Sequence, residues 1–290
     1  MVLTPVLARR RLGAELKSLR EAAKVSVKAA AEHLECSTAK ISRLETGKGV
    51  PYRRDVRDLL DLYGVTDEFV VDQALEWAEV GQTRAWWDKY GDLRRADPPL
   101  DRLIQLEASA SRSLSFHSNL VPALVQTEGY ARAVLHALNP GATDAALEEK
   151  VRIRLERQQV LARKPKPLYM TAVLDEAILR RPIGDHEVMR EQLDVIRSAV
   201  EDQNSPVTIR VLPFEAGGHQ GLTGSFRIFD FADDADQDVV IIEHVNGSVI
   251  LEVDEDVAQY RLIFDGIRQK SWNQADTVKH LSEAIDRLTL

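Results

Sequence analysis

The sequence is poor in cysteine and has no long apolar run. Its single cysteine among 290 residues, Cys36, excludes an internal disulfide framework and any metal site built from several cysteines. No apolar run approaches the length needed to span a bilayer. The apolar residues 2–7 precede the basic residues 9–11, which is the reverse of the order in a secretory signal. We therefore expect a cytoplasmic protein with no membrane partner.

Internal repeats and low-complexity segments are also missing from the sequence. Its length and its 44% hydrophobic content indicate two globular domains with sizeable cores. The net charge of −8 is unevenly distributed, because residues 1–60 contain 13 Lys and Arg against 7 Asp and Glu, whereas residues 61–290 contain 25 against 39. A basic head on an acidic body is typical of a protein that binds nucleic acid through one end. The alternative is that the basic residues only solvate a helical surface.

Residues 26–47 have the pattern of a helix-turn-helix. Two short helices that cross steeply need small side chains where they meet, and Ala30 and Ala31 provide them. The chain breaks near Glu35, and Ser37 can cap the helix that follows. A helical hairpin of an all-α protein without DNA contacts remains the alternative for this segment.

The second helix of this segment buries one side through Ile41 and Leu44, which are three residues apart, and leaves the other side free for a major groove. Arg43 could pair bidentately with guanine, and a threonine or alanine there could contact a thymine methyl group. The free N–H groups at the helix start would suit a phosphate. The predicted DNA-contacting residues of this helix are Ser37, Thr38, Ala39, Lys40 and Arg43.

The flanking residues extend the pattern. Leu19-Arg20 belong to an amphipathic first helix over 9–22, and Gly47 followed by Pro51 ends the second helix of the motif. Together with the runs 26–31 and 37–47, these residues resemble the Cro and phage-repressor type of helix-turn-helix regulator. The resemblance implies an all-α, five-helix DNA-binding domain, which we place at 1–80.

The resemblance also indicates where the DNA backbone is contacted. Lys48, Arg53 and Arg54 follow the recognition helix at positions where family members contact the sugar-phosphate backbone, and Lys28 completes the predicted DNA-binding set. The basic run 9–11 could form an arm that touches phosphate, or equally a solvated tail.

Two positions depart from the family pattern. Glu35 stands where the family usually has glycine in the turn, which suggests a turn held at some strain. Val27 stands where the family usually has a glutamine that contacts the DNA backbone.

The chain changes character after residue 80. Residues 81–99 contain Trp86-Trp87 and Pro98-Pro99, and we interpret them as a junction, with a second domain at 100–290. The pattern of this domain predicts an α+β fold with a mostly antiparallel sheet, in which Asn246-Gly247 form a hairpin turn. The predicted helices are 101–113, 127–138, 145–163, 187–200, 254–269 and 274–288, and the predicted strands are 168–174, 207–212, 226–231, 239–243 and 248–253.

Several motifs of the second domain carry a further resemblance. They are LVPALVQTEGYA at 120–131, Arg154 with Arg157-Gln158, the residues from Asp175 to Pro182, VLPF at 211–214, and Gly218-His219. The domain resembles the effector domain that follows such a helix-turn-helix in a large group of actinobacterial transcriptional regulators. The resemblance implies a repressor-like or antitoxin-like regulator, often encoded beside a small partner protein.

Catalytic and ligand-binding patterns are few in the second domain. His186-Glu187 lacks the second histidine of a zinc-protease motif, and the glycine-rich run 217–221 lacks the Lys-Ser/Thr of a phosphate loop. His219, Asp175 and Glu176 could in principle form an acid-base site at strand ends, but we predict no enzyme, no metal and no cofactor. Arg180 and Arg181, with His219, are candidate effector contacts for a carboxylate or phosphate, and structural or solvated arginines are the alternative.

The sequence as a whole predicts a sequence-specific regulator that binds a double-stranded DNA operator as a homodimer. Its second domain would bind an effector or a small partner protein encoded nearby. An antitoxin-like protein-interaction module that acts mainly through that partner is the first alternative, and an enzyme in the second domain is a weaker one.

Overall fold

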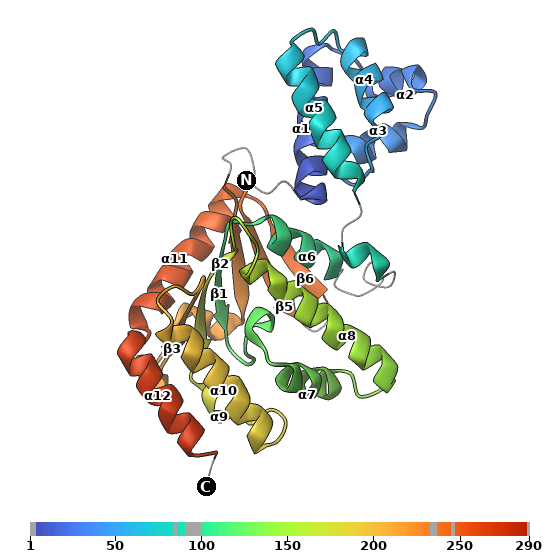
Figure 1. The fold of residues 1–290 in the computed structure, drawn as a ribbon. Helices are drawn as coiled ribbons and strands as arrows, with labels where there is room; N and C mark the ends of the chain where they lie inside the picture. The colour runs from blue at the N-terminus through green and yellow to red at the C-terminus, as the bar shows by residue number, and fades with distance from the viewer. Residues whose placement is uncertain (1–3, 84–85, 91–99, 233–236, 245–246, 289–290) are drawn as a thin grey trace. The chain divides into compact units, whose positions relative to one another are not determined.

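The computed structural model describes residues 4–83, 86–90, 100–232, 237–244 and 247–288. The chain divides into two compact units, residues 1–93 and 94–290 (Figure 1). The predicted junction 81–99 lies for the most part outside the described residues, and Pro98-Pro99 lie wholly outside them.

The first unit consists of helices, and its described residues contain the five α-helices that the sequence predicts. They pack around a core in which Leu16, Ile41 and Leu59 are fully buried. The long first helix lies along the fifth (Figure 1). The helices are α1 (Pro5–Ala22), α2 (Val27–His33), α3 (Thr38–Glu45), α4 (Arg53–Leu62) and α5 (Glu68–Gln82), followed by a short 3₁₀ helix, Trp86–Lys89.

The two alternatives for residues 9–11, a basic arm or a solvated tail, are both wrong, because these residues lie inside α1 and are half-buried. The helix begins at Pro5 and is capped by Thr4, whose hydroxyl accepts from the Leu7 backbone N–H at 3.3 Å. Arg9 donates through Nε to the carbonyl of Gly81 at 2.6 Å, so it ties α1 to the end of α5. The Thr-Pro pair marks this helix start in the sequence.

The second unit is built on one six-stranded sheet. Its helices are α6 (Leu100–Ser109), α7 (Glu128–Leu138), α8 (Asp144–Arg157), α9 (Ala177–Arg180), α10 (His186–Glu201), α11 (Asp254–Lys270) and α12 (Gln274–Asp286). Its strands are β1 (Arg112–His117), β2 (Tyr169–Asp175), β3 (Val207–Leu212), β4 (Phe226–Asp230), β5 (Val239–His244) and β6 (Gly247–Leu251).

The sheet is mixed, so the predicted mostly antiparallel sheet is wrong. The strand order is β3-β2-β1-β4-β5-β6, with β1, β2 and β3 mutually parallel and the remaining pairs antiparallel. The predicted helix 101–113 ends at Ser109, and β1 follows it in the centre of the sheet. Without β1 the parallel half of the sheet could not be recognised. Strands β5 and β6 pair as predicted, but Asn246 lies outside the described residues.

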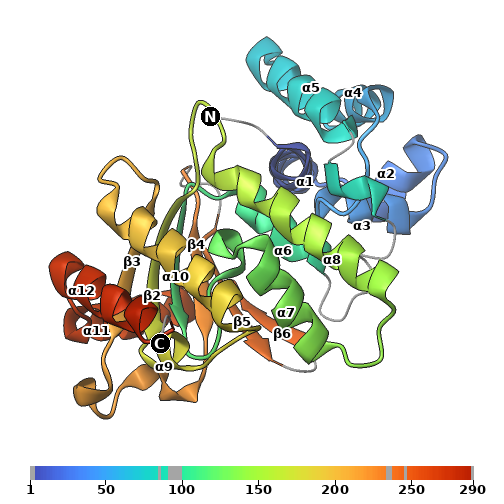
Figure 2. The ribbon, with the colours of Figure 1, turned by 60° about the horizontal axis from the view of Figure 1, so that its bottom comes forward.

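Helices cover both faces of the sheet (Figures 1 and 2). Alternate residues of β2 divide between two cores: Met170 and Leu174 pack with α10 and α12, whereas Val173 packs with α11. Helices α6 and α7 also contribute to the first of these cores. None of the helices in the described part of the chain has the length and apolar character needed to span a bilayer.

Candidate nucleic-acid interface

Two serines set the starts of the helix-turn-helix. The hydroxyl of Ser26 accepts from the backbone N–H of Ala29 at 3.1 Å, and the hydroxyl of Ser37 accepts from that of Lys40 at 3.3 Å. Each serine occupies one otherwise unsatisfied donor at a helix N-terminus. The start of α3 is exposed, so its remaining N–H groups are open to an anion.

The turn between α2 and α3 uses a left-handed residue. Glu35 has a φ of +49°, the conformation that glycine adopts readily and that costs other residues about 1 kcal/mol. The next residue, Cys36, donates its backbone N–H to the carbonyl of Ala31 at 2.9 Å. The turn therefore keeps the left-handed geometry although glycine is absent.

Helix α1 packs against α3 and fixes its position. Gly13 lets the two backbones approach closely, because a Cβ at this position would lie 2.5 Å from the carbonyl oxygen of Leu44. Arg20 pairs with Glu45 through two hydrogen bonds of 2.6 and 3.1 Å and also donates to the carbonyl of Val25 at 3.0 Å. Both paired side chains are nearly buried, at 11% and 8% exposure. Sequence reasoning did not identify this pair, although both residues belong to the motif.

The outward side of α3 presents most of the predicted readers. Ser37, Thr38, Ala39 and Arg43 are exposed, while Ile41 and Leu44 on the opposite side are buried. Within the described part of the chain the Arg43 guanidinium has no hydrogen-bond or ion-pair partner. Its five donors are therefore free for an external acceptor.

Lys40 differs from the other predicted readers because it is already paired. Its Nζ lies 2.6 Å from Oδ2 of Asp55, a residue of α4. The hydrogen bond to Asp55 raises the pKa of Lys40. A base contact by Lys40 would require this pair to open, whereas the pair as it stands joins α3 to α4.

The predicted backbone contacts are exposed and weakly paired. Nζ of Lys28 lies 3.8 Å from Oε1 of Glu32, and Nη1 of Arg53 lies 3.2 Å from Oε2 of Glu79. Nε of Arg54 lies 3.7 Å from Oδ2 of Asp58. Exposed pairs of this kind contribute roughly 0–1 kcal/mol, so a phosphate can compete for these side chains. Lys48 is exposed and has no side-chain partner among the described residues.

The three predicted effector residues lie at the carboxyl end of the parallel strands but do not form one clamp. Arg180 donates through Nε to Glu176 at 2.8 Å and lies over the ring of Phe214. Arg181 is exposed and donates to Oδ1 of Asn119 at 3.3 Å. The ring of His219 lies edge-on against Phe116, with centroids 5.7 Å apart.

The carboxylates that could assist His219 have structural partners. Asp175 accepts from the backbone N–H of Ala177 at 2.8 Å. Glu176 is buried, pairs with Arg180 and accepts from the backbone N–H of Phe214 at 2.9 Å. These bonds close the loops at the ends of β2 and β3.

The second unit contains a buried charged network that sequence reasoning missed. Glu107 of α6 is fully buried and accepts from Arg157 of α8 at 2.7 and 2.9 Å and from Arg227 of β4 at 3.2 Å. A signal for it exists in the sequence, because Glu107 lies three and four residues after Ile104 and Leu103, on the apolar side of α6.

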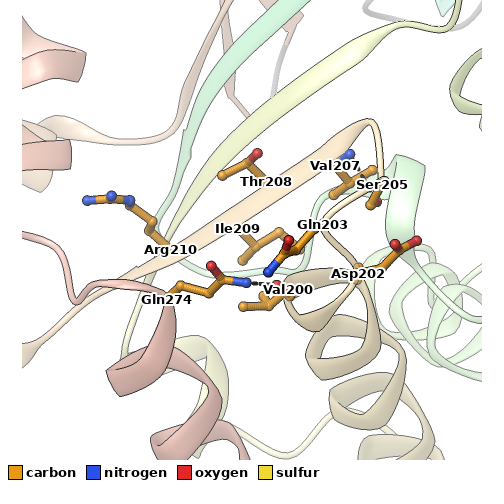
Figure 3. Close-up of a pocket in the computed structure, with 10 residues that line it drawn as sticks. Val200, Asp202, Gln203, Ser205, Val207, Thr208, Ile209, Arg210 and Gln274 are labelled. Atoms are coloured by element: carbon orange, nitrogen blue, oxygen red, sulfur yellow. Dashed lines mark hydrogen bonds between the residues drawn. The ribbon is translucent and has the colours of Figure 1, made fainter.

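A cavity of about 300 Å³ lies beside β3, the edge strand on that side of the sheet (Figure 3). Thr208, Ile209 and Arg210 line it from the strand, and Gln274 closes it by donating to the carbonyl of Val200 at 2.6 Å. The lining contains none of the predicted site residues.

Comparison with known proteins gives two matches. A helix-turn-helix domain family matches residues 11–70. A domain of unknown function, DUF5753, matches residues 100–283. No curated protein and no solved structure matches the chain.

Proposed function

Because the chain belongs to the family of DUF5753 and has a helix-turn-helix domain at its N-terminus, we propose that it is a sequence-specific DNA-binding transcriptional regulator. The helix-turn-helix match supports a DNA-binding regulator. The observation that carries sequence specificity is the exposed side of α3, where Arg43 has no partner among the described residues.

In this proposal α3 enters the major groove. Arg43 reads guanine through its planar fork, and Thr38 or Ala39 contacts a thymine methyl group. The exposed start of α3 at Ser37 receives a phosphate. The DNA backbone is contacted by four exposed basic residues, Lys28, Lys48, Arg53 and Arg54. These contacts set the position of the domain without reading sequence.

The regulator acts as a homodimer on a two-fold operator, with half-sites about one helical turn apart. The second domain receives an effector or a small partner protein, as the resemblance to repressor-like and antitoxin-like regulators implies. An interaction module that works mainly through such a partner protein is the second candidate, favoured by the same resemblance.

The test is operator selection by Arg43 variants. We expect Arg43→Ala to lose about 1–3 kcal/mol of preference for the operator base that Arg43 reads, while the domain stays folded. Arg43→Lys is the matched control, because it keeps the charge but loses the fork. It should retain non-specific binding and lose most of the preference. Footprinting on selected genomic fragments measures both.

Three outcomes separate the candidates. An unchanged footprint with Arg43→Ala contradicts the assignment of the reading helix. The absence of any salt-dependent gel shift favours the interaction module. A cofactor or metal retained in native mass spectrometry favours an enzyme in the second domain.

A further inference from the structure

The interior of the second unit contains more positive than negative charge around α8. The guanidiniums of Arg157 and Arg227 both bond to Glu107. A further carboxylate near this network, that of Glu243, has its Oε2 3.9 Å from Nη2 of Arg227 and is half exposed. The two inner arginines therefore make three hydrogen bonds to the buried carboxylate, and no hydrogen bond joins Glu107 to a third cation among the described residues.

Arg154 is that third cation. It lies one turn before Arg157 on α8, and among the described residues its guanidinium has one partner, Oε1 of Gln126, at 2.9 Å. Burial and the nearby charge of Arg157 lower its pKa to about 10. Arg154 is partly buried, and its one hydrogen-bond partner is a neutral amide. The charges of Glu243 and Glu107 act on it without a hydrogen bond to it, so a direct anionic partner would compensate its charge better.

Two neighbouring side chains, Gln126 and Tyr130, are held in place by hydrogen bonds to the backbone of Val121. Gln126 donates its amide N–H to the carbonyl of Val121 at 2.7 Å, which fixes its oxygen toward Arg154. The hydroxyl of Tyr130 accepts from the backbone N–H of Val121 at 3.4 Å, and its own hydrogen has no acceptor in the described part of the chain. A donor that is free and largely buried suits an incoming acceptor.

Arg181 joins this group from the outside. It is exposed, and its one hydrogen-bond partner among the described residues is the side-chain oxygen of Asn119, two residues beyond the end of β1. Asn119 lies two residues before Val121, whose backbone bonds to both Tyr130 and Gln126, so the partners of Arg181 and Arg154 belong to one short segment. Burial raises the pKa of Tyr130, while the Val121 hydrogen bond and the charges of Arg181 and Arg154 oppose this rise.

The place in the fold is one that ligands favour. Strands β1 and β2 are parallel, and their carboxyl ends carry the segments with Asn119 and Arg181. Ligands of open α/β sheets bind outside the carboxyl ends of such strands. Beside this end, Nε2 of His117 is buried and has no partner among the described residues.

The geometry points to a site at the carboxyl end of β1 in which Arg154 and Arg181 hold the carboxylate or phosphate group of a small ligand beside the Tyr130 hydroxyl. The guanidiniums supply the planar donors that bind such groups, and the phenol supplies one more. The regulatory meaning of this site rests on the function proposed above, but binding of the anion does not.

The experiment uses the full chain and two probes, inorganic phosphate and acetate, each compared with sodium chloride at equal ionic strength. Thermal unfolding followed by circular dichroism should show the second unit unfolding at a higher temperature as one or both probes increase, because a ligand that binds only the folded state stabilises it by mass action. Phosphate and acetate distinguish the two ligand classes.

The variants test the residues. Arg154→Gln should abolish the upward shift in unfolding temperature, and Arg152→Gln, which removes one exposed charge from the same helix, should keep it. Arg181→Gln removes an exposed side chain, so it should fold normally and bind the anion several-fold more weakly. It provides the measurement if Arg154→Gln fails to fold.

Two results would overturn the site: no response of the wild type to either probe beyond that to chloride, or an unchanged response in both Arg154→Gln and Arg181→Gln. Gel shifts on the same preparation keep the two proposals apart. An anion response without DNA binding contradicts only the proposed function, and DNA binding without an anion response contradicts only the site.

Discussion

His117 shows how one residue makes the second unit sensitive to acid. It ends β1, and burial together with the positive charge of Arg227 lowers its pKa to about 3. Between its ordinary value of 6.5 and 3, the unfolded chain takes up a proton that the folded chain refuses. The free energy of unfolding should therefore fall as the pH falls below 6.5, by up to about 1.4 kcal/mol per pH unit.

Replacing His117 by Asn should remove this contribution. Urea unfolding of the second unit between pH 7 and pH 4 should then depend less steeply on pH than in the wild type. His136→Asn, at an exposed position of α7, is the control and should retain the wild-type slope. Parallel curves for wild type and His117→Asn would show that this imidazole is not held neutral by the fold.

At the scale of elements, the Arg20–Glu45 pair decides whether α3 keeps its orientation on α1. Both side chains are nearly buried and doubly bonded, so removing one partner leaves the other charge without compensation. We expect Arg20→Met to cost about 3–5 kcal/mol of stability in the first unit. Thermal or denaturant unfolding without DNA measures this loss.

The control for that pair is an exposed one. Arg54→Met breaks the contact with Asp58, whose geometry is loose at 3.7 Å, and should change stability by no more than about 1 kcal/mol. The double change Arg20→Met with Glu45→Leu should recover most of the loss, because it removes both buried charges together. Equal losses for Arg20→Met and Arg54→Met would contradict a structural role of the buried pair.

Elements with local signals were predictable from the sequence, and elements defined by distant partners were not. Helix α3 has its cap at Ser37 and its apolar pair Ile41 and Leu44 within eight residues, so its extent could be predicted closely. Strand β1 has buried serines at 113 and 115 on one face, which removes the apolar alternation that identifies a strand.

The same limit applies to the charged residues of the second unit, whose partners lie far away in the sequence. Glu107 bonds to residues that are 50 and 120 positions away in the chain, and no local pattern links them. Arg180 and Arg181 are adjacent in the sequence and suggested one clamp, but the structure turns them to different partners, Glu176 and Asn119. Adjacent charges in a short helix and its cap point in different directions, so sequence spacing alone could not assign their roles.

At the scale of the whole molecule, the uneven charge predicts where salt acts on DNA binding. Residues 1–60 have a surplus of basic residues, while the rest of the chain is acidic and should repel DNA at long range. Each lysine or arginine that neutralises a phosphate releases counterions, which makes the affinity fall as salt rises. Lys48 has no side-chain partner among the described residues, so its full charge is available for a phosphate.

Lys48→Gln should therefore weaken binding about equally on all DNA sequences and reduce the slope of log K against log salt by about 1. Arg152→Gln removes the same charge from the second unit and should leave both slope and sequence preference unchanged. Fluorescence anisotropy on operator and scrambled duplexes over a range of salt concentrations measures the two slopes. If Arg152→Gln lowers the slope as much as Lys48→Gln does, the second unit also contacts DNA, and phosphate binding cannot be confined to the helix-turn-helix domain.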